Sequence, residues 1–178
     1  YLLLQQMNIL RIRYFGKKKY LQGIQIISVD KNMSPFSYFG DIYINPDLHT
    51  EEEIREILAH ESAHVRQLHS IDVILFELLK IFFWINPAVW LLKREVRQNL
   101  EFLADNKVLT AGFDSKKYQY HLLQLSFQTP DVKIGNQFNV SPLKKRIIMM
   151  NKKNSNRTAL LKYMLIIPLV LALVISSN

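Results

Sequence analysis

The pattern of apolar and polar positions predicts a mostly helical chain with a small β element near its N-terminus. β-branched residues cluster at 24–29 and 41–44, which predicts two strands. Residues 50–69 contain no Gly or Pro and predict one helix, because Thr50 and Glu53 are spaced as the capping box that starts a helix. These elements together predict an α+β fold.

Two further helices are predicted downstream. Asn86 is a good N-cap, Pro87 suits the first helical position and Gly112 suits the C-terminal stop, so the run between them predicts a long helix. Residues 115–127 predict a shorter amphipathic helix, followed by a loop at 128–140.

The strongest apolar run is residues 159–175, whose one charged residue is Lys162. Its 17 residues are near the lower limit for a helix that crosses about 30 Å of hydrocarbon. Lys162 lies near the start of the run, where its side chain can reach the lipid headgroups. We therefore predict a transmembrane helix at 158–176, with a buried or interfacial helix as the open alternative.

A second apolar run, residues 73–85, includes Glu77 and Lys80, which are spaced to form an ion pair. As a helix it would be about 20 Å long, which is too short to cross a bilayer. We expect a membrane-interfacial helix with Trp84 and Trp90 at the depth of the headgroups. Packing into a soluble core is the alternative.

The charge distribution argues against a nucleic-acid-binding face. The net charge is +8, but residues 141–178 hold seven of the 23 Lys and Arg and no Asp or Glu, while the first 140 residues carry 16 basic and 15 acidic residues. The excess marks a basic juxtamembrane segment at 141–157. Because basic segments stay on the cytoplasmic side, the Asn178 end is expected across the membrane.

The N-terminal residues extend this organisation. Residues 1–10 are apolar and 11–19 are basic, which predicts the end of a preceding membrane helix and a basic linker at 1–20. The folded domain is then expected at 21–140. The sequence has no Cys, which excludes thiolate zinc sites and cysteine nucleophiles.

Candidate chemistry centres on the sequence His60-Glu61-Ser62-Ala63-His64. Positions i and i+4 share one face of a helix, so His60 and His64 can present two imidazoles to one metal ion. Glu61 then lies beside the open coordination position, where its carboxylate can take a proton from metal-bound water. The alternative is a solvated helix face that carries two histidines without binding a metal.

A third ligand is needed, and the candidate is Glu101. Glu101 and Asp105 are again four residues apart, and apolar neighbours predict that their shared helix face is partly buried. A buried carboxylate needs a partner. Zinc would be the partner of Glu101, and Asp105 can accept the spare ring N–H of a ligating histidine. The alternative is two carboxylates that stay in water.

Other candidates are weaker. A metzincin site requires Gly and His where this chain has Gln67 and Ser70, and His69 is out of register, so we expect His69 at the surface or in an interface. The donor that stabilises an oxyanion is open, and the candidates by residue type alone are Tyr118, Tyr120 and His121.

The combination of His-Glu-x-x-His, the stretch Trp84 to Trp90, and Glu101-x-x-x-Asp105 resembles the BlaR/MecR-type bacterial membrane metallopeptidases. The resemblance covers roughly residues 35–130, and the basic tail is also similar. It implies a mostly helical zincin-like (gluzincin) domain that binds Zn²⁺ through His60, His64 and Glu101, with Glu61 as the general base and Asp105 bonded to a ligating histidine. It also implies that the chain is a piece of a longer protein.

We therefore expect a membrane-embedded zinc endopeptidase of signal transduction in the bacterial inner membrane, with its active site facing the cytoplasm. Its partners would be membrane lipids, a repressor-like protein or peptide substrate, and a periplasmic sensor or transducer domain beyond the C-terminus; it would not bind nucleic acid directly. A non-catalytic transducer with a vestigial zincin fold is the alternative, and Glu61 argues against it. A basic amphipathic membrane-binding module would leave both paired motifs unexplained.

Overall fold

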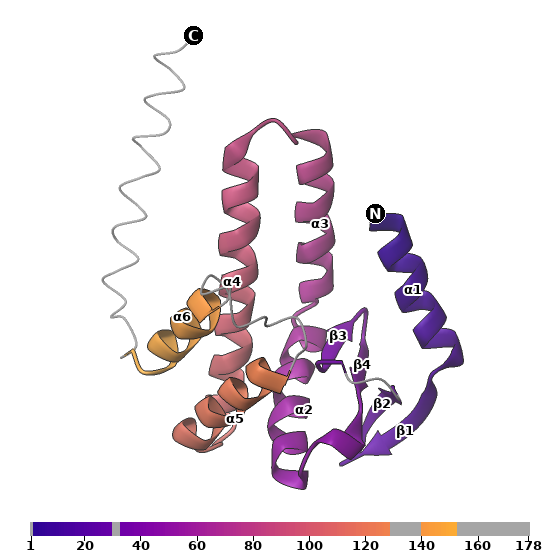
Figure 1. The fold of residues 1–178 in the computed structure, drawn as a ribbon, viewed down its shortest axis with the longest axis vertical. Coiled ribbons are helices and arrows are strands. Elements are labelled where there is room, and N and C mark those ends of the chain that lie inside the picture. Colours follow the sequence, from indigo (N-terminus) through magenta and orange to yellow (C-terminus); the bar gives the residue numbers. More distant parts are fainter. Residues whose placement is uncertain (1, 30–32, 129–139, 153–178) are drawn as a thin grey trace.

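The computed structural model describes residues 2–29, 33–128 and 140–152 (Figure 1). The N-terminal part of the described residues carries a small sheet, and most of the helices follow it in the chain. The elements in chain order are α1 (Leu2–Phe15), β1 (Lys17–Leu21), β2 (Ile24–Ser28), β3 (Phe36–Tyr38), β4 (Asp41–Ile44), a 3₁₀ turn (Pro46–Leu48), α2 (Glu51–Arg66), α3 (His69–Phe82), α4 (Pro87–Thr110), α5 (Ser115–Gln128) and α6 (Val140–Met150).

The four strands form one mixed sheet in the order β1-β2-β4-β3. The two strands predicted from the sequence, β2 and β4, are confirmed and pair in parallel at its centre, with Ile26 opposite Ile42. The flanking strands are antiparallel and were not predicted. Three exposed lysines in β1 led us to expect a basic linker there, and β3 has only three residues, too few for a pattern.

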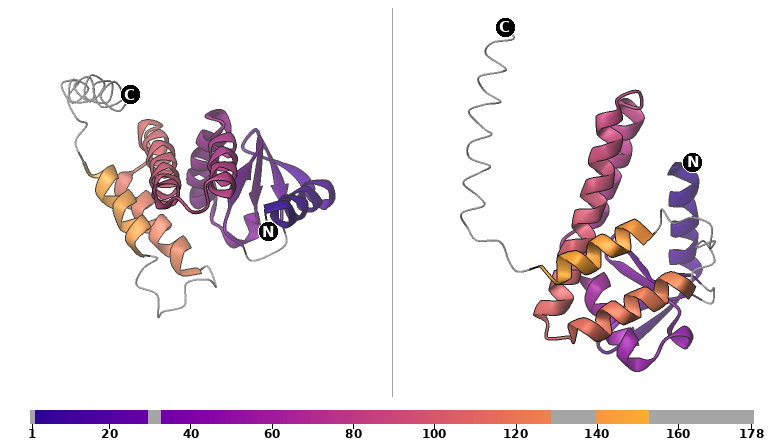
Figure 2. Two further views of the ribbon diagram at one scale, coloured as in Figure 1. Left: turned by 90° about the horizontal axis from the view of Figure 1, so that it is seen from above. Right: turned by 60° about the vertical axis from the view of Figure 1, so that its left-hand side comes forward.

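Each face of the sheet packs against a different helix (Figure 2). Because strand side chains alternate between faces, Ile26 and Ile42 point toward α2 and pack on Ile57 and Leu58. The opposite face is packed by α1 through Ile9, Ile12 and neighbouring residues. Burial of this apolar surface fixes α2, which carries the histidine motif, against the sheet.

The capping box at the start of α2 is confirmed. The backbone N–H of Glu53 donates to the Thr50 side chain at 3.3 Å, and the Glu53 carboxylate accepts from the Thr50 N–H at 2.8 Å. The single helix expected at 50–69 is wrong at its end, however. Leu68 adopts a left-handed conformation with φ of 56°, which terminates α2 and starts a new helix at His69.

Helices α3 and α4 form a hairpin that projects beyond the sheet (Figure 1). Asn86 caps α4, as predicted: its side-chain oxygen accepts a hydrogen bond from the backbone N–H of Ala88 at 2.9 Å. Glu77 pairs with Lys93 of the facing helix at 2.5 Å instead of with Lys80. The Lys80 ammonium lies over the Trp90 ring. The expected ion pair within one helix is therefore replaced by contacts between the two helices of the hairpin.

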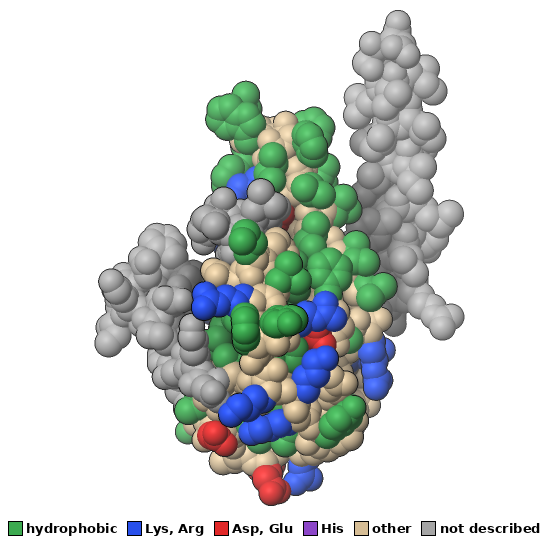
Figure 3. Space-filling view, turned by 90° about the vertical axis from the view of Figure 1, so that its right-hand side faces the viewer, with side chains coloured by type: hydrophobic (Ala, Val, Ile, Leu, Met, Phe, Trp, Pro, Cys, Tyr) green, Lys and Arg blue, Asp and Glu red, His purple; other side chains and the backbone are tan. Residues whose placement is uncertain are grey.

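The tip of this hairpin exposes large apolar side chains to solvent (Figure 3). They include Phe82, Phe83, Trp84, Ile85 and Leu91. No helix within the described residues combines the length and the apolar composition needed to cross a bilayer. The transmembrane helix predicted at 158–176 lies outside the described residues, as does almost all of the loop predicted at 128–140.

Candidate metal centre

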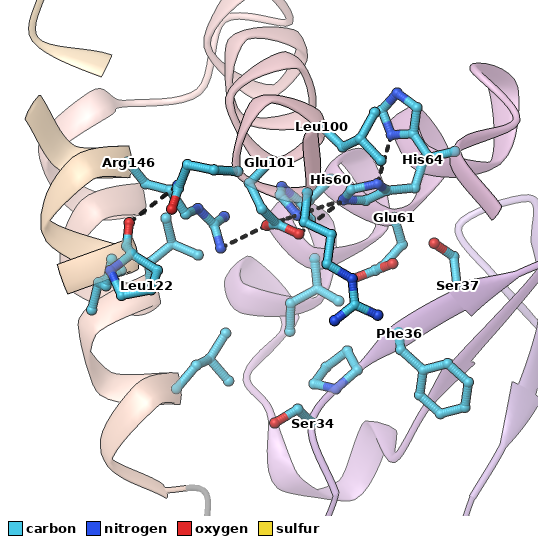
Figure 4. A pocket seen from close by; sticks show the side chains of 18 of the residues that line it. Ser34, Phe36, Ser37, His60, Glu61, His64, Leu100, Glu101, Leu122 and Arg146 are labelled. Carbon is cyan, nitrogen blue, oxygen red and sulfur yellow. Dashed lines mark hydrogen bonds and ion pairs between the residues drawn. The ribbon is translucent and has the colours of Figure 1, made fainter. Parts of the chain in front are cut away.

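His60, His64 and Glu101 converge where α2 packs against α4 (Figure 4). The two Nε2 atoms are 3.1 Å apart, and the Glu101 carboxylate oxygens lie 3.5 Å from Nε2 of His60 and 3.8 Å from Nε2 of His64. Tetrahedral coordination with bonds of about 2.1 Å separates two ligand atoms by about 3.4 Å. The observed separations bracket this value, so the donor set fits zinc in both chemistry and spacing.

The other ring nitrogen of His60, Nδ1, contacts two side chains on the side away from Glu101. Its Nδ1 lies 2.9 Å from the hydroxyl of Tyr118 and 3.3 Å from Asp105 Oδ1. The Tyr118 hydroxyl donates to the same Asp105 oxygen at 2.7 Å, so it can accept the N–H of His60. A proton on Nδ1 leaves the lone pair of Nε2 free for a metal. Asp105 thus makes the contact with a candidate ligand that its spacing led us to expect.

Arg146 of α6 also contacts this site, a role that the sequence did not predict. Its guanidinium donates to Asp105 at 2.8 and 2.6 Å and pairs with Glu101 at 2.9 Å. In the sequence, Arg146 is one of several basic residues of the segment at 141–157. The buried Asp105 and the partly buried Glu101 require a cation nearby, but nothing local in the sequence identifies which of 23 basic residues supplies it.

The charges of the site favour a cation between the imidazoles. Burial alone would lower the pKa of His60, but hydrogen bonds to the carboxylates of Asp105 and Glu101 raise it to about 9. Burial and the neighbouring His60 lower the pKa of His64 to about 4. Burial alone would raise the pKa of Glu101, yet His60 and Arg146 lower it to about 2. At neutral pH an ionised Glu101 therefore faces a protonated His60 and a neutral His64, and a divalent metal can replace the second ring proton of His60.

Glu61, the residue after His60, turns toward β3 (Figure 4). Its side chain is buried and lies near Ser37, whose hydroxyl acts to lower the pKa of the Glu61 carboxyl. Burial raises the pKa of Glu61, against the opposing effect of His60. A carboxylate whose pKa is raised toward neutrality is a better proton acceptor at neutral pH than an ordinary one.

The remaining candidates separate clearly. Tyr120 is largely exposed, whereas Tyr118 is turned toward His60 and Asp105. His121 lines the cleft and pairs with the buried Glu56 at 2.6 Å. His69 is 4% exposed, so of the two positions expected for it, surface or interface, the surface position is wrong. It is buried because the left-handed Leu68 folds the start of α3 back onto His64.

A cleft of about 920 Å³ opens onto these groups. Phe36, Ser37 and Tyr38 of β3 form one wall, and β3 is an edge strand of the sheet. Helices α2 to α6 all contribute to the lining. The candidate ligands therefore lie in an accessible cleft beside a strand whose outer edge has no partner strand among the described residues.

We predict that Arg146→Ala lowers the free energy of unfolding by about 3–5 kcal/mol, because it leaves the Asp105 carboxylate buried without its cation. Lys145→Ala is the matched control. Lys145 is the adjacent residue and forms an exposed pair with Glu95 at 3.5 Å, so the change should stay within about 1 kcal/mol. Urea unfolding measures both. Equal effects of the two substitutions would contradict the buried ion pair.

Comparison with known proteins agrees with this geometry. Residues 24–150 match the family described as BlaR1 peptidase M56. The curated relative "Regulatory protein BlaR1" of Bacillus licheniformis is 26% identical over 135 residues, which cover 71% of this chain and 22% of the relative. The chain thus spans about a fifth of that relative's length. The family match covers more than half of the chain and contains the entire His/His/Glu cluster, so the chain belongs to the BlaR1 peptidase M56 family.

Proposed function

We propose that this chain is the catalytic part of a zinc endopeptidase that acts in membrane signal transduction. One observation carries the proposal: Nε2 of His60, Nε2 of His64 and the Glu101 carboxylate converge at ligand spacing in an open cleft, with Glu61 beside them. Membership of a peptidase family agrees with it. Zinc at this position would supply a Lewis acid that activates water and polarises the scissile carbonyl.

The chain's own groups would perform the proton transfers. Glu61 accepts a proton from the attacking water on its carboxylate and passes it to the nitrogen of the leaving amine. Ser37 lines the cleft beside that carboxylate, and its hydroxyl can donate a hydrogen bond to it. Asp105 and Tyr118 keep the proton of His60 on Nδ1, away from the cleft. Arg146 orients Glu101 and offsets its charge.

The substrate would bind as an extended peptide along β3. A strand at the edge of a sheet offers unpaired backbone groups to which a peptide can add as a further strand. Phe36–Tyr38 pairs with β4 on one side and lines the cleft. The backbone bonds of this mode do not depend on sequence, so the side pockets of the cleft would select the substrate.

We place this peptidase at the cytoplasmic face of a bacterial inner membrane. The exposed apolar tip of the hairpin supports membrane contact, because large apolar patches are rare on free surfaces. Interfacial tryptophans such as Trp84 are typical of such a contact. The substrate would be a cytoplasmic repressor-like protein, in keeping with a relative named as a regulatory protein. A periplasmic sensor or transducer domain would supply the signal.

We predict that Glu61→Gln lowers peptide hydrolysis by about 10²–10⁴-fold while zinc binding persists, because the amide cannot accept the proton and Glu61 is not a ligand. Glu51→Gln, an exposed change on the same helix, should have no effect. Mass spectrometry of a cleaved peptide library measures turnover, and a chelator competition measures zinc. Unchanged turnover in Glu61→Gln would exclude Glu61 as the base. Zinc binding without hydrolysis in the wild type would favour a non-catalytic transducer.

The proposed orientation is tested with reporters. A reporter active only in the periplasm is fused after Asn178, and a second copy is inserted within residues 128–140, where the sequence predicts a loop. Residues 141–162 hold seven basic residues and no acidic ones. Because such a segment stays on the cytoplasmic side, the terminal fusion should be active and the internal fusion silent. The reverse pattern would place the cleft, and therefore the substrate, on the periplasmic side.

A further inference from the structure

The imidazole of His69 is in direct contact with a candidate metal ligand. Its Nδ1 lies 2.7 Å from Nδ1 of His64, and its Nε2 lies 2.9 Å from Oε1 of Gln67. The His64 and His69 rings meet edge to face, with centroids 4.8 Å apart. Two ring nitrogens this close form a hydrogen bond only if one of them carries a hydrogen. The sequence motif did not explain this buried histidine.

Counting donors along this chain of contacts assigns the hydrogens. An amide oxygen only accepts, so the contact with Gln67 requires a hydrogen on Nε2 of His69. A neutral His69 then has a bare Nδ1, which accepts. His64 must therefore donate from its own Nδ1, and its Nε2 is left with a lone pair. That lone pair is the group that lies near His60 and Glu101.

We propose that His69 is a positioning residue: it holds His64 in the tautomer and ring orientation that present Nε2 to the metal. The inference rests on the metal site of the proposed function. His69 would be the hydrogen-bond partner of Nδ1 of His64, as Asp105 and Tyr118 are the partners of Nδ1 of His60. Such partners of ligating histidines typically change metal affinity by about 10–100-fold when removed.

The same contact joins the projecting hairpin to the metal centre. His69 is the first residue of α3, and Leu68, in a left-handed conformation, connects it to α2. A leucine in this conformation is strained and persists only where its surroundings hold it. A movement of α3 away from α2 would separate His69 from His64 and release the ring of that ligand. The position of the hairpin therefore bears on the contact that holds the His64 ring.

Two amide substitutions test the assignment on the full chain. The side-chain oxygen of Asn is as many bonds from Cβ as Nδ1 of histidine, whereas the oxygen of Gln matches Nε2. His69→Asn therefore keeps an acceptor for His64 and should bind zinc within about threefold of wild type. His69→Gln and His69→Leu should weaken zinc binding by about 10–100-fold. His49→Leu, which replaces a histidine that does not line the cleft, is the control and should bind as wild type.

Zinc affinity is measured by competition with a chromogenic chelator, and the ligand geometry by the visible spectrum of the cobalt-substituted protein. We expect the cobalt spectrum of His69→Asn to match wild type and that of His69→Gln to differ. Equal zinc affinity of the Asn and Gln variants would overturn the proposal, even if His69→Leu fails to fold. Loss of zinc in His64→Ala with no effect of His69→Gln would reject only the role of His69. Full zinc affinity in His64→Ala would reject the metal site and this proposal together.

Discussion

The carboxylate of Asp105 lies where four helices meet. It belongs to α4, it accepts hydrogen bonds from Tyr118 of α5 and Arg146 of α6, and it lies beside Nδ1 of His60 on α2. It is 1% exposed, so each of these contacts is needed to offset the cost of burying its charge. The position of the metal-binding face therefore depends on how this one carboxylate is satisfied.

The contacts around Asp105 contribute more to the precise positions of the side chains than to the free energy of unfolding. A buried ion pair contributes little net stability against a well-packed apolar alternative, but it penalises any structure in which one partner is displaced. Arg146 contacts both Asp105 and Glu101, so it fixes the candidate ligand relative to its supporting group. Ligands held by neighbouring hydrogen bonds need little rearrangement to bind a metal.

The parts of the site that follow helical spacing could be predicted from the sequence. His60 with His64, and Glu101 with Asp105, are each one turn apart, and the structure brings the two pairs together. The contacts of Arg146 could not be predicted, because it is 41 residues from Asp105 and only tertiary packing joins them.

The same limit explains the other differences in the fold. The break before His69 depends on a left-handed Leu68, a conformation that leucine rarely adopts and that no pattern indicates. Strand β1 is rich in exposed lysine, so its sequence shows no strand pattern. Pairing with β2 stabilises it. The clusters of β-branched residues identified β2 and β4, which form the buried centre of the sheet. Local rules therefore located the core strands and the ligand pairs, while the contacts that complete the site required the structure.

The central claim is that one zinc ion binds between α2 and α4, and X-ray absorption at the zinc edge tests it most directly. We expect scattering from two imidazoles and at least one oxygen at about 2.0–2.2 Å from the zinc. The imidazole scattering should be lost in the variant that combines His60→Ala and His64→Ala. A zinc environment that keeps both imidazoles in that variant would contradict the account.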